Sequence, residues 1–277
     1  MSALLLDIGG SWMRLGSGAR DARPLRVSTP VNLSDAKAAL NTLIAQARKS
    51  ALFSSTSEVV VSIGGLVDRN GTVQRSIYTP FAGINMRALL GELGLSAVHV
   101  ENDAKFQLRG LPRLGITVLV SAGTGIGGAA GIAGKPFADA HAFGGEFGHA
   151  FFTGIDELCP CGAKGCLDLV LGGRAIERRL GPDWHFGEAS SETSEYVTVI
   201  AHHIGMLTTS LLRVYDPHAI YFSGHLFANR AIRVAACRSV EHHWTRARCG
   251  FVPETWAIAT KALSRVARLQ RQEKLVA

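Results

Sequence analysis

Leu4-Leu5-Leu6-Asp7-Ile8-Gly9-Gly10-Ser11 stands near the start of the chain and decides its fold. An apolar run that ends in a glycine pair, followed by strand-like residues from Trp12 to Gly16, predicts a strand, a tight turn and a second strand. Glycines let backbone N–H groups approach phosphate oxygens, the Ser11 hydroxyl adds a donor, and the Asp7 carboxylate can hold the water shell of Mg²⁺. Alone, a glycine pair usually marks nothing more than a turn.

The same pattern returns over residues 116–134. An apolar strand runs into Gly123-Thr124-Gly125-Ile126-Gly127-Gly128, and the small residues after it indicate a returning strand. A dinucleotide-binding turn would open a helix, so a hairpin that clamps phosphate is favoured; a ligand-free turn is the alternative. No Walker-type motif is present, which disfavours a P-loop enzyme. Two such hairpins indicate two related halves with a cleft between them.

Helices and strands alternate along the rest of the chain. The spacing of apolar residues predicts helices over 34–52, 85–93, 194–214 and 261–274, and strands over 58–63, 97–101 and 218–222. The fold class is therefore α/β.

Composition narrows the class of protein. The chain has 277 residues, 47% hydrophobic and 18% charged, which fits a globular protein of one or two domains. Charges interrupt the apolar runs and the first residues carry no basic leader, so we expect a cytoplasmic protein with no membrane partner. The net charge is +7, but the basic residues are scattered apart from Arg265, Arg268 and Arg271, so nucleic acid is not expected as a partner.

Glu101-Asn102-Asp103-Ala104 follows the strand predicted over 97–101. A carboxylate at a strand end can accept the proton of an attacking hydroxyl, and a neighbouring amide can bind a second hydroxyl. The same residues are common helix N-caps, and the tetrapeptide alone favours capping.

Three of the five cysteines lie within eight positions, which suits a metal site in a reducing compartment. Cys159, Cys161 and Cys166, with His149, offer the ligands that tetrahedral Zn²⁺ prefers. Four protein ligands leave no open position, so the site would be structural. A redox-active thiol cluster is the alternative. Zinc would fix both ends of the loop and place Glu146 and Asp168 where they can jointly receive ligand hydroxyls; without zinc both are ordinary surface acids.

Taken in this order, the segments resemble the ROK family, which contains bacterial sugar kinases and sugar-responsive repressors. The resemblance is carried by Asp7–Ser11, Ser62–Asp68, Glu101–Ala104, Gly123–Gly127, Gly145–His149 and the knuckle Cys159–Cys166.

The resemblance implies an actin-like ATPase (ribonuclease H-like) fold, with two α/β domains around an interdomain cleft. The smaller domain would comprise residues 1–104 and 262–277, and the larger, with the zinc knuckle, residues 105–261. A homodimer is also expected.

The implied activity is ATP-dependent phosphorylation of a hexose or N-acetylhexosamine, at the C6 hydroxyl, with Asp103 as the general base. Glucose, N-acetylglucosamine and N-acetylmannosamine are the leading substrates, and the cofactors are ATP, Mg²⁺ and structural Zn²⁺. The implied sugar contacts are Gly65, Asn102, Asp103, Glu146, His149 and Asp168. The implied contacts to ATP and its metal are Asp7, Gly9, Gly10, Ser11, Gly123, Thr124, Gly125 and Gly127.

The chain departs from the family pattern in several places. Asp168 stands where Glu is usual, Ser11 replaces Thr, Lys105 begins an unusual stretch in a helix that is normally Ala-rich, and a Gly triplet reads Ser223-Gly224-His225. A sugar-sensing repressor is the main alternative, but its helix-turn-helix would precede a motif that here begins at Asp7. A catalytically inactive sugar binder is disfavoured by Asp103 and the two glycine loops.

Overall fold

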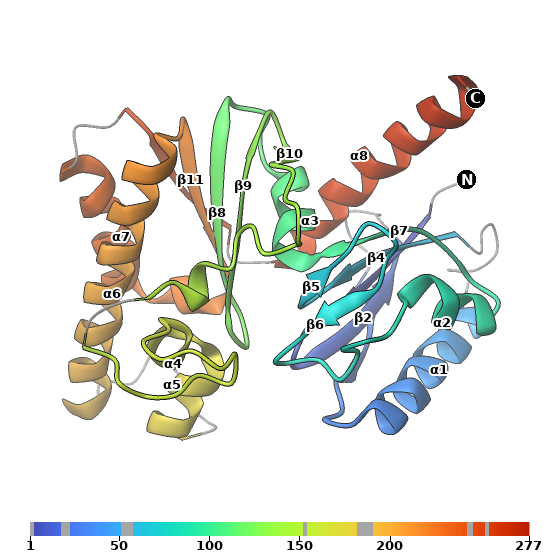
Figure 1. Ribbon diagram of the computed structural model, residues 1–277, viewed down its shortest axis with the longest axis horizontal. Helices are drawn as coiled ribbons and strands as arrows, with labels where there is room; N and C mark the ends of the chain where they lie inside the picture. Colours follow the sequence, from blue (N-terminus) through green and yellow to red (C-terminus); the bar gives the residue numbers. More distant parts are fainter. Residues whose placement is uncertain are drawn as a thin grey trace. The chain divides into compact units, whose positions relative to one another are not determined.

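The computed structural model describes residues 3–17, 23–50, 58–151, 154–181, 191–242, 246–252 and 255–276, without the side chains of 191–194 and 268–276. The contacts within the chain divide it into two units, each built on a five-stranded sheet with helices (Figure 1). Unit 1 comprises Met1–Leu111, Asp139–Phe143 and Trp256–Ala277. Unit 2 comprises Pro112–Ala138 and Gly144–Thr255.

The sheet of unit 1 has the strand order β3-β2-β1-β4-β7. Strands β1, β4 and β7 run parallel, while β2 returns antiparallel to β1 and confirms the predicted hairpin. Ile8, Ile63 and Asn102 are in register, so the segments that follow them leave the same edge of the sheet. The strands are β1 (Leu4–Ile8), β2 (Trp12–Gly16), β3 (Leu25–Ser28), β4 (Glu58–Ile63) and β7 (Ser96–Asn102).

Helices cover both faces of this sheet, which explains why every residue of β1 is buried, Asp7 included. Leu4, Leu6 and Ile8 belong to the core cluster that includes the buried face of α1, while Leu5 belongs to a second cluster with residues of α3 and α8. The remaining elements of unit 1 are α1 (Leu33–Lys49), β5 (Leu66–Val67), β6 (Val73–Arg75), α2 (Met86–Glu92), α3 (Asp103–Gly110) and α8 (Thr255–Val276).

Unit 2 repeats this arrangement, with the strand order β10-β9-β8-β11-β12. Strands β8, β11 and β12 are parallel, and β9 returns antiparallel to β8. The shared topology agrees with the recurrence seen in the sequence. The elements are β8 (Ile116–Ala122), β9 (Ile126–Ile132), β10 (Lys135–Pro136), η2 (Phe147–His149), α4 (Asp168–Leu171), α5 (Gly173–Leu180), α6 (Ser191–Tyr215), β11 (Ala219–Ser223), η3 (His225–Ala228), α7 (Arg230–His242) and β12 (Arg248–Val252).

Helix α6 corrects one expectation from the sequence. Residues Glu195–Tyr215 are long and apolar enough, by length and composition, to cross a membrane, so charges do not interrupt every apolar run. In unit 2 the helix packs against α7, and Ile200, Ile204, Leu207 and Leu211 lie in the core at helical spacing. The apolar face of α6 is thus part of a packed core.

Arg265, one of the three clustered basic residues, also has a structural role. Its guanidinium donates to the carbonyl oxygens of Arg109 and Leu111, where α3 ends. The side chains of Arg268 and Arg271 lie outside the described residues.

Candidate functional site

Asn102, rather than Asp103, caps helix α3. The side-chain oxygen of Asn102 accepts a hydrogen bond from the Lys105 N–H at 3.1 Å, and its amide donates to the Gly65 carbonyl at 3.0 Å. The amide also donates to Asp103 Oδ1 at 3.2 Å, and the Ala104 N–H donates to the same oxygen at 2.8 Å. Both bonds fall on Oδ1, while Oδ2 lies beside Gly64, 3.7 Å from the position of a Cβ there. The Asp103 carboxylate is therefore held in one orientation.

Burial and the nearby carboxylate of Asp7 shift the proton affinity of Asp103. Burial is the larger effect, and together they raise the pKa of Asp103 to about 6, although the backbone N–H groups of Ala104 and Asp103 and the charge of Arg14 act in the opposite direction. Such a carboxyl is ionised at neutral pH, yet it is a better proton acceptor than an ordinary aspartate. Asp103 has the protonation behaviour that a general base requires.

Asp7 is almost fully buried and accepts three hydrogen bonds. Ser62 donates to Oδ1 at 2.7 Å, and Arg14, which is paired with Asp7 across the β1–β2 hairpin, donates to Oδ2 at 3.0 and 2.5 Å. A carboxylate has about four acceptor positions, so Asp7 has room for roughly one more donor. A single remaining acceptor position on Asp7 suits a hydrogen bond from one water of a Mg²⁺ shell better than direct coordination of the ion.

The turn of the β1–β2 hairpin is fixed by the neighbouring chain. Gly9 N–H donates to the Trp12 carbonyl at 2.9 Å, and Thr29 donates through its hydroxyl to the Gly9 carbonyl at 2.7 Å and through its N–H to the Ser11 carbonyl at 3.0 Å. Gly10 lies between these anchors, so the predicted phosphate loop is preorganised.

Only glycine fits at position 65, for reasons of both backbone conformation and space. Its φ is +133°, and a Cβ would lie 2.6 Å from the Arg75 carbonyl oxygen. This tight approach brings the Gly65 carbonyl to the amide of Asn102.

The second glycine loop is the turn between β8 and β9, which confirms the returning strand. The carbonyls of Gly123 and Thr124 accept hydrogen bonds at 3.0 Å from the N–H groups of Gly173 and Arg174, at the start of α5. Gly125 completes the turn by accepting from the Gly123 N–H at 2.9 Å. Because the tip carbonyls are satisfied, the turn is rigid and leads directly into Gly127 of β9.

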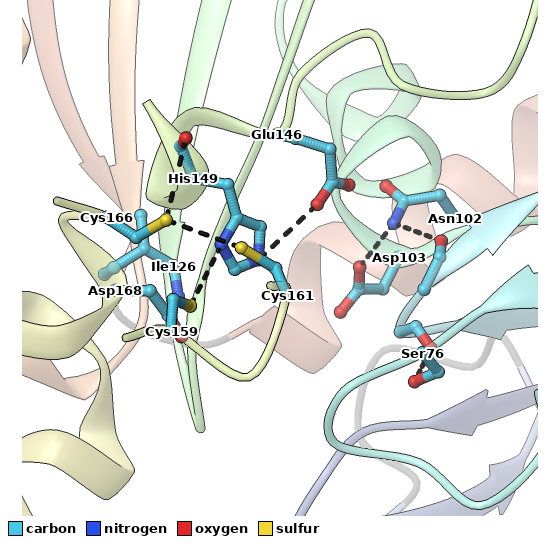
Figure 2. A network of polar contacts seen from close by, with 12 residues as sticks. Ser76, Asn102, Asp103, Ile126, Glu146, His149, Cys159, Cys161, Cys166 and Asp168 are labelled. Carbon is cyan, nitrogen blue, oxygen red and sulfur yellow. Dashed lines mark hydrogen bonds and ion pairs between the residues drawn. The ribbon is translucent and has the colours of Figure 1, made fainter. Parts of the chain in front are cut away.

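The four predicted metal ligands come together in unit 2. The ligand atoms of His149, Cys159, Cys161 and Cys166 all lie within 4.8 Å of one another. Cys161 Sγ is 3.5 Å from Cys166 Sγ, and Cys159 Sγ is 3.6 Å from His149 Nδ1 (Figure 2). With Zn–S bonds of about 2.3 Å, a tetrahedral ion separates two sulfur ligands by roughly 3.8 Å. The donor set and its spacing therefore fit a zinc ion.

The thiols of Cys159 and Cys166 are poor acids in the absence of a cation. Burial, with the hydrogen bonds and charges of the neighbouring thiols, raises the pKa of Cys166 to about 12. A bound cation would reverse this, because it stabilises thiolates and releases their protons.

The imidazole of His149 connects the cluster to Glu146. Nδ1 faces Cys159, whereas Nε2 lies 3.9 Å from Glu146 Oε2, as Figure 2 shows. The side chain of Glu146 is about a third exposed, at 31%. One nitrogen of His149 is thus available to a metal ion while the other faces a carboxylate that solutes can reach.

Asp168 is buried, with 3% of its surface exposed. Its Oδ1 accepts a hydrogen bond from the Ile126 N–H at 2.6 Å. The carboxylate that was expected to meet a sugar hydroxyl thus bonds the backbone of the glycine hairpin.

The sequence patterns did not indicate two of the ion pairs in unit 1, Arg14–Asp7 and Arg109–Glu101. Arg14 pairs with Asp7, and the hairpin register contained that signal, since a two-residue turn at Gly10 and Ser11 places these two residues opposite each other. Glu101 receives two hydrogen bonds from Arg109, at 2.7 and 2.8 Å. Burial opposes its ionisation, but the bonds from Arg109 and His99 outweigh it and lower the pKa of Glu101 to about 2. Glu101 is a structural anion, not a second base.

The predicted residues fall into two sets. Unit 1 holds Asp7, Gly9, Gly10, Ser11, Gly65, Asn102 and Asp103. Unit 2 holds Gly123, Thr124, Gly125, Gly127, Glu146, His149, Cys159, Cys161, Cys166 and Asp168.

Comparison with known proteins gives consistent matches. The model of the ROK family matches residues 6–255. N-acetyl-D-glucosamine kinase from Vibrio atlanticus is 27% identical over 257 residues, covering 79% of this chain and 83% of that protein. The Escherichia fergusonii protein of the same name is 26% identical, covering 86% and 88%.

A solved structure extends the match to nearly the whole chain. The ROK family glucokinase from Streptomyces griseus, in complex with glucose and AMPPNP, has a TM-score of 0.80 at 21% identity and covers 96% of this chain and 99% of its own. This similarity confirms the expected actin-like ATPase fold.

Proposed function

The chain belongs to the ROK family, and on this premise we propose that it transfers the γ-phosphoryl group of ATP to a hydroxyl of a hexose or N-acetylhexosamine, with the C6 hydroxyl as acceptor. The names of the relatives support sugar phosphorylation over the repressor-like alternative. N-acetylglucosamine is the first substrate to test, with glucose and N-acetylmannosamine next.

The environment of Asp103 carries the proposal. A fixed carboxylate with a pKa of about 6 can accept the proton of the sugar hydroxyl as its oxygen attacks the γ-phosphorus. The bond from the γ-phosphorus to the bridging oxygen breaks, and ADP leaves with that electron pair. Asn102 orients Asp103 and binds a neighbouring sugar hydroxyl.

The two glycine hairpins would stabilise the phosphates. Gly9, Gly10 and Ser11 in one turn, and the segment Gly123–Gly127 in the other, present backbone donors in loops that are already ordered. Mg²⁺, held through water at Asp7, would neutralise phosphate charge.

Glu146 and His149 are proposed to bind sugar hydroxyls from unit 2. Zn²⁺ held by His149, Cys159, Cys161 and Cys166 would fix the loop that carries them and take no part in the chemistry. We also propose that units 1 and 2 correspond to the two expected domains. The cytoplasmic location and the homodimer stay predictions from the sequence.

The proposal is tested by ADP release from ATP and Mg²⁺ with a panel of hexoses and N-acylhexosamines, followed by NMR of the products. We expect sugar-dependent ADP release with N-acetylglucosamine or glucose and a phosphate on O6. Sugar binding without ADP release with any sugar of the panel would instead support the inactive sugar binder.

A further inference from the structure

We propose that Lys105 is a positioning residue for the sugar, because it anchors the segment that leads to Glu146. This inference rests on the function proposed above. We call residues Asp139–Phe143 the strap. The strap clusters with unit 1, although the residues on either side of it belong to unit 2.

The ammonium group of Lys105 holds the strap at two points. It pairs with Asp139 Oδ2 at 2.5 Å and donates to the Ala142 carbonyl at 3.1 Å. Its side chain is 11% exposed and that of Asp139 28%. A hydrogen-bonded ammonium so little exposed to water is a strong and directional tether.

The backbone of Lys105 belongs to the active-site segment. Its N–H donates to the side chain of Asn102, the residue that orients Asp103. Lys105 therefore contacts Asn102, the helix cap next to Asp103, through its main chain, and it contacts the strap through its side chain.

The strap ends shortly before the sugar-binding residues proposed in unit 2. Ala142, whose φ is +63°, precedes Glu146 by four positions, and Gly145 has a φ of +95°. Beyond Glu146 the chain is held again at His149 in the cysteine cluster. Glu146 thus lies on a short segment with one tether on each side, and the loss of either tether increases its conformational freedom.

The kinetic consequence follows from the position of the tether. Releasing the strap leaves Asp103, both hairpins and the cluster unchanged, so the effect falls on sugar affinity. Lys105→Met, which keeps the bulk of the side chain and removes the charge, is expected to raise KM for the sugar about tenfold, the size of one charge-assisted bond. We expect kcat, KM for ATP and the metal content to change less than about twofold. Lys105→Arg should restore most of the affinity.

Asp139→Asn is a second variant, on a partly exposed residue, in case Lys105→Met does not fold. It weakens the same tether and should raise KM for the sugar by a smaller factor. Lys135→Met, at an exposed lysine of β10, is the matched control and should leave every constant unchanged.

Hydrogen exchange of the peptide spanning residues 139–149 separates the tether from the activity. We expect faster exchange in Lys105→Met than in wild type and Lys135→Met, whether or not a sugar is turned over. Unchanged exchange and unchanged KM for the sugar would overturn the role of Lys105. A lower kcat, higher KM values for both substrates and a lower metal content, all changed by similar factors and not restored by Lys105→Arg, would indicate general damage and would also overturn the role of Lys105. A wild-type protein that phosphorylates no sugar, yet shows the exchange difference, would refute the proposed function and leave the tether standing.

Discussion

Asp168 accepts a hydrogen bond from the backbone N–H of Ile126 at 2.6 Å, and this bond connects a residue two positions after Cys166 to the glycine hairpin. Since Asp168 is buried, the carboxylate supports the strand that leaves the turn, and we infer that it stabilises the phosphate loop.

Two substitutions at Asp168 distinguish this support from a sugar contact. Asp168→Asn keeps an oxygen that can accept from Ile126, so we expect KM for the sugar within about threefold of wild type. Asp168→Ala leaves a buried N–H unpaired, a cost of about 1–3 kcal/mol, and should raise KM for ATP about tenfold. Steady-state kinetics with each substrate varied would check this. A large rise in KM for the sugar alone in Asp168→Asn would restore the sugar contact inferred from the sequence.

The pH dependence of turnover should report the environment of Asp103. Only the ionised carboxylate accepts a proton, and burial with the nearby Asp7 raises the pKa to about 6. We therefore expect kcat to be level above pH 7 and to fall about tenfold per pH unit well below 6. The measurement is kcat at saturating ATP and sugar between pH 5 and 8. A constant kcat down to pH 5 would contradict the assignment.

Asp103 should also reduce the stability of the protein at neutral pH. Its folded-state pKa lies above the ordinary value of 3.8, so between these two pH values the folded chain binds more protons than the unfolded chain. The free energy of unfolding therefore decreases as pH rises through that window. Asp103→Asn removes this cost and should be more stable than wild type at pH 7.5, by on the order of 1–3 kcal/mol.

Thermal unfolding at two pH values tests this expectation. The advantage of Asp103→Asn should shrink at pH 4.5, where wild-type Asp103 is protonated. Asp156→Asn, at an exposed aspartate, is the control and should show little change at either pH. An Asp103→Asn protein less stable than wild type at pH 7.5 would mean that the carboxylate is stabilising.

Part of the fold and of the candidate site was predictable from the sequence. The hairpin turns, the strand ends and the cysteine cluster were readable because each depends on local residue types: glycines at tight turns, apolar runs in buried strands and closely spaced thiols. Asp103 was selected because it follows a predicted strand, and its role as the base came from the resemblance to the ROK family. The sequence could not distinguish a base from a cap at residues 102 and 103, because both residues cap helices well and only the tertiary contacts divide the roles.

Contacts between segments far apart in the chain could not be predicted from the sequence. The bond from Ile126 to Asp168 spans 42 positions and that from Lys105 to Asp139 spans 34, and no local pattern records such pairings. The burial of Asp168 also depends on tertiary packing, so no local pattern could indicate it.

Metal removal provides a further prediction. The purified protein should contain about one zinc ion per chain, and Cys161→Ser should lose most of it together with sugar affinity. Cys237→Ser, at a cysteine outside the cluster, is the matched control and should keep its zinc. Elemental analysis with sugar titration by calorimetry is the measurement. Full sugar affinity in a zinc-free protein would show that the cluster does not position Glu146.

The most direct measurement compares ADP release by wild type and Asp103→Asn, with N-acetylglucosamine and glucose at saturating ATP and Mg²⁺, beside calorimetric binding of the same sugars. General-base catalysis contributes about 10²–10⁴-fold, so kcat should fall by several orders of magnitude while sugar affinity stays within about threefold. Near-normal turnover in Asp103→Asn would contradict the role of Asp103 as the base.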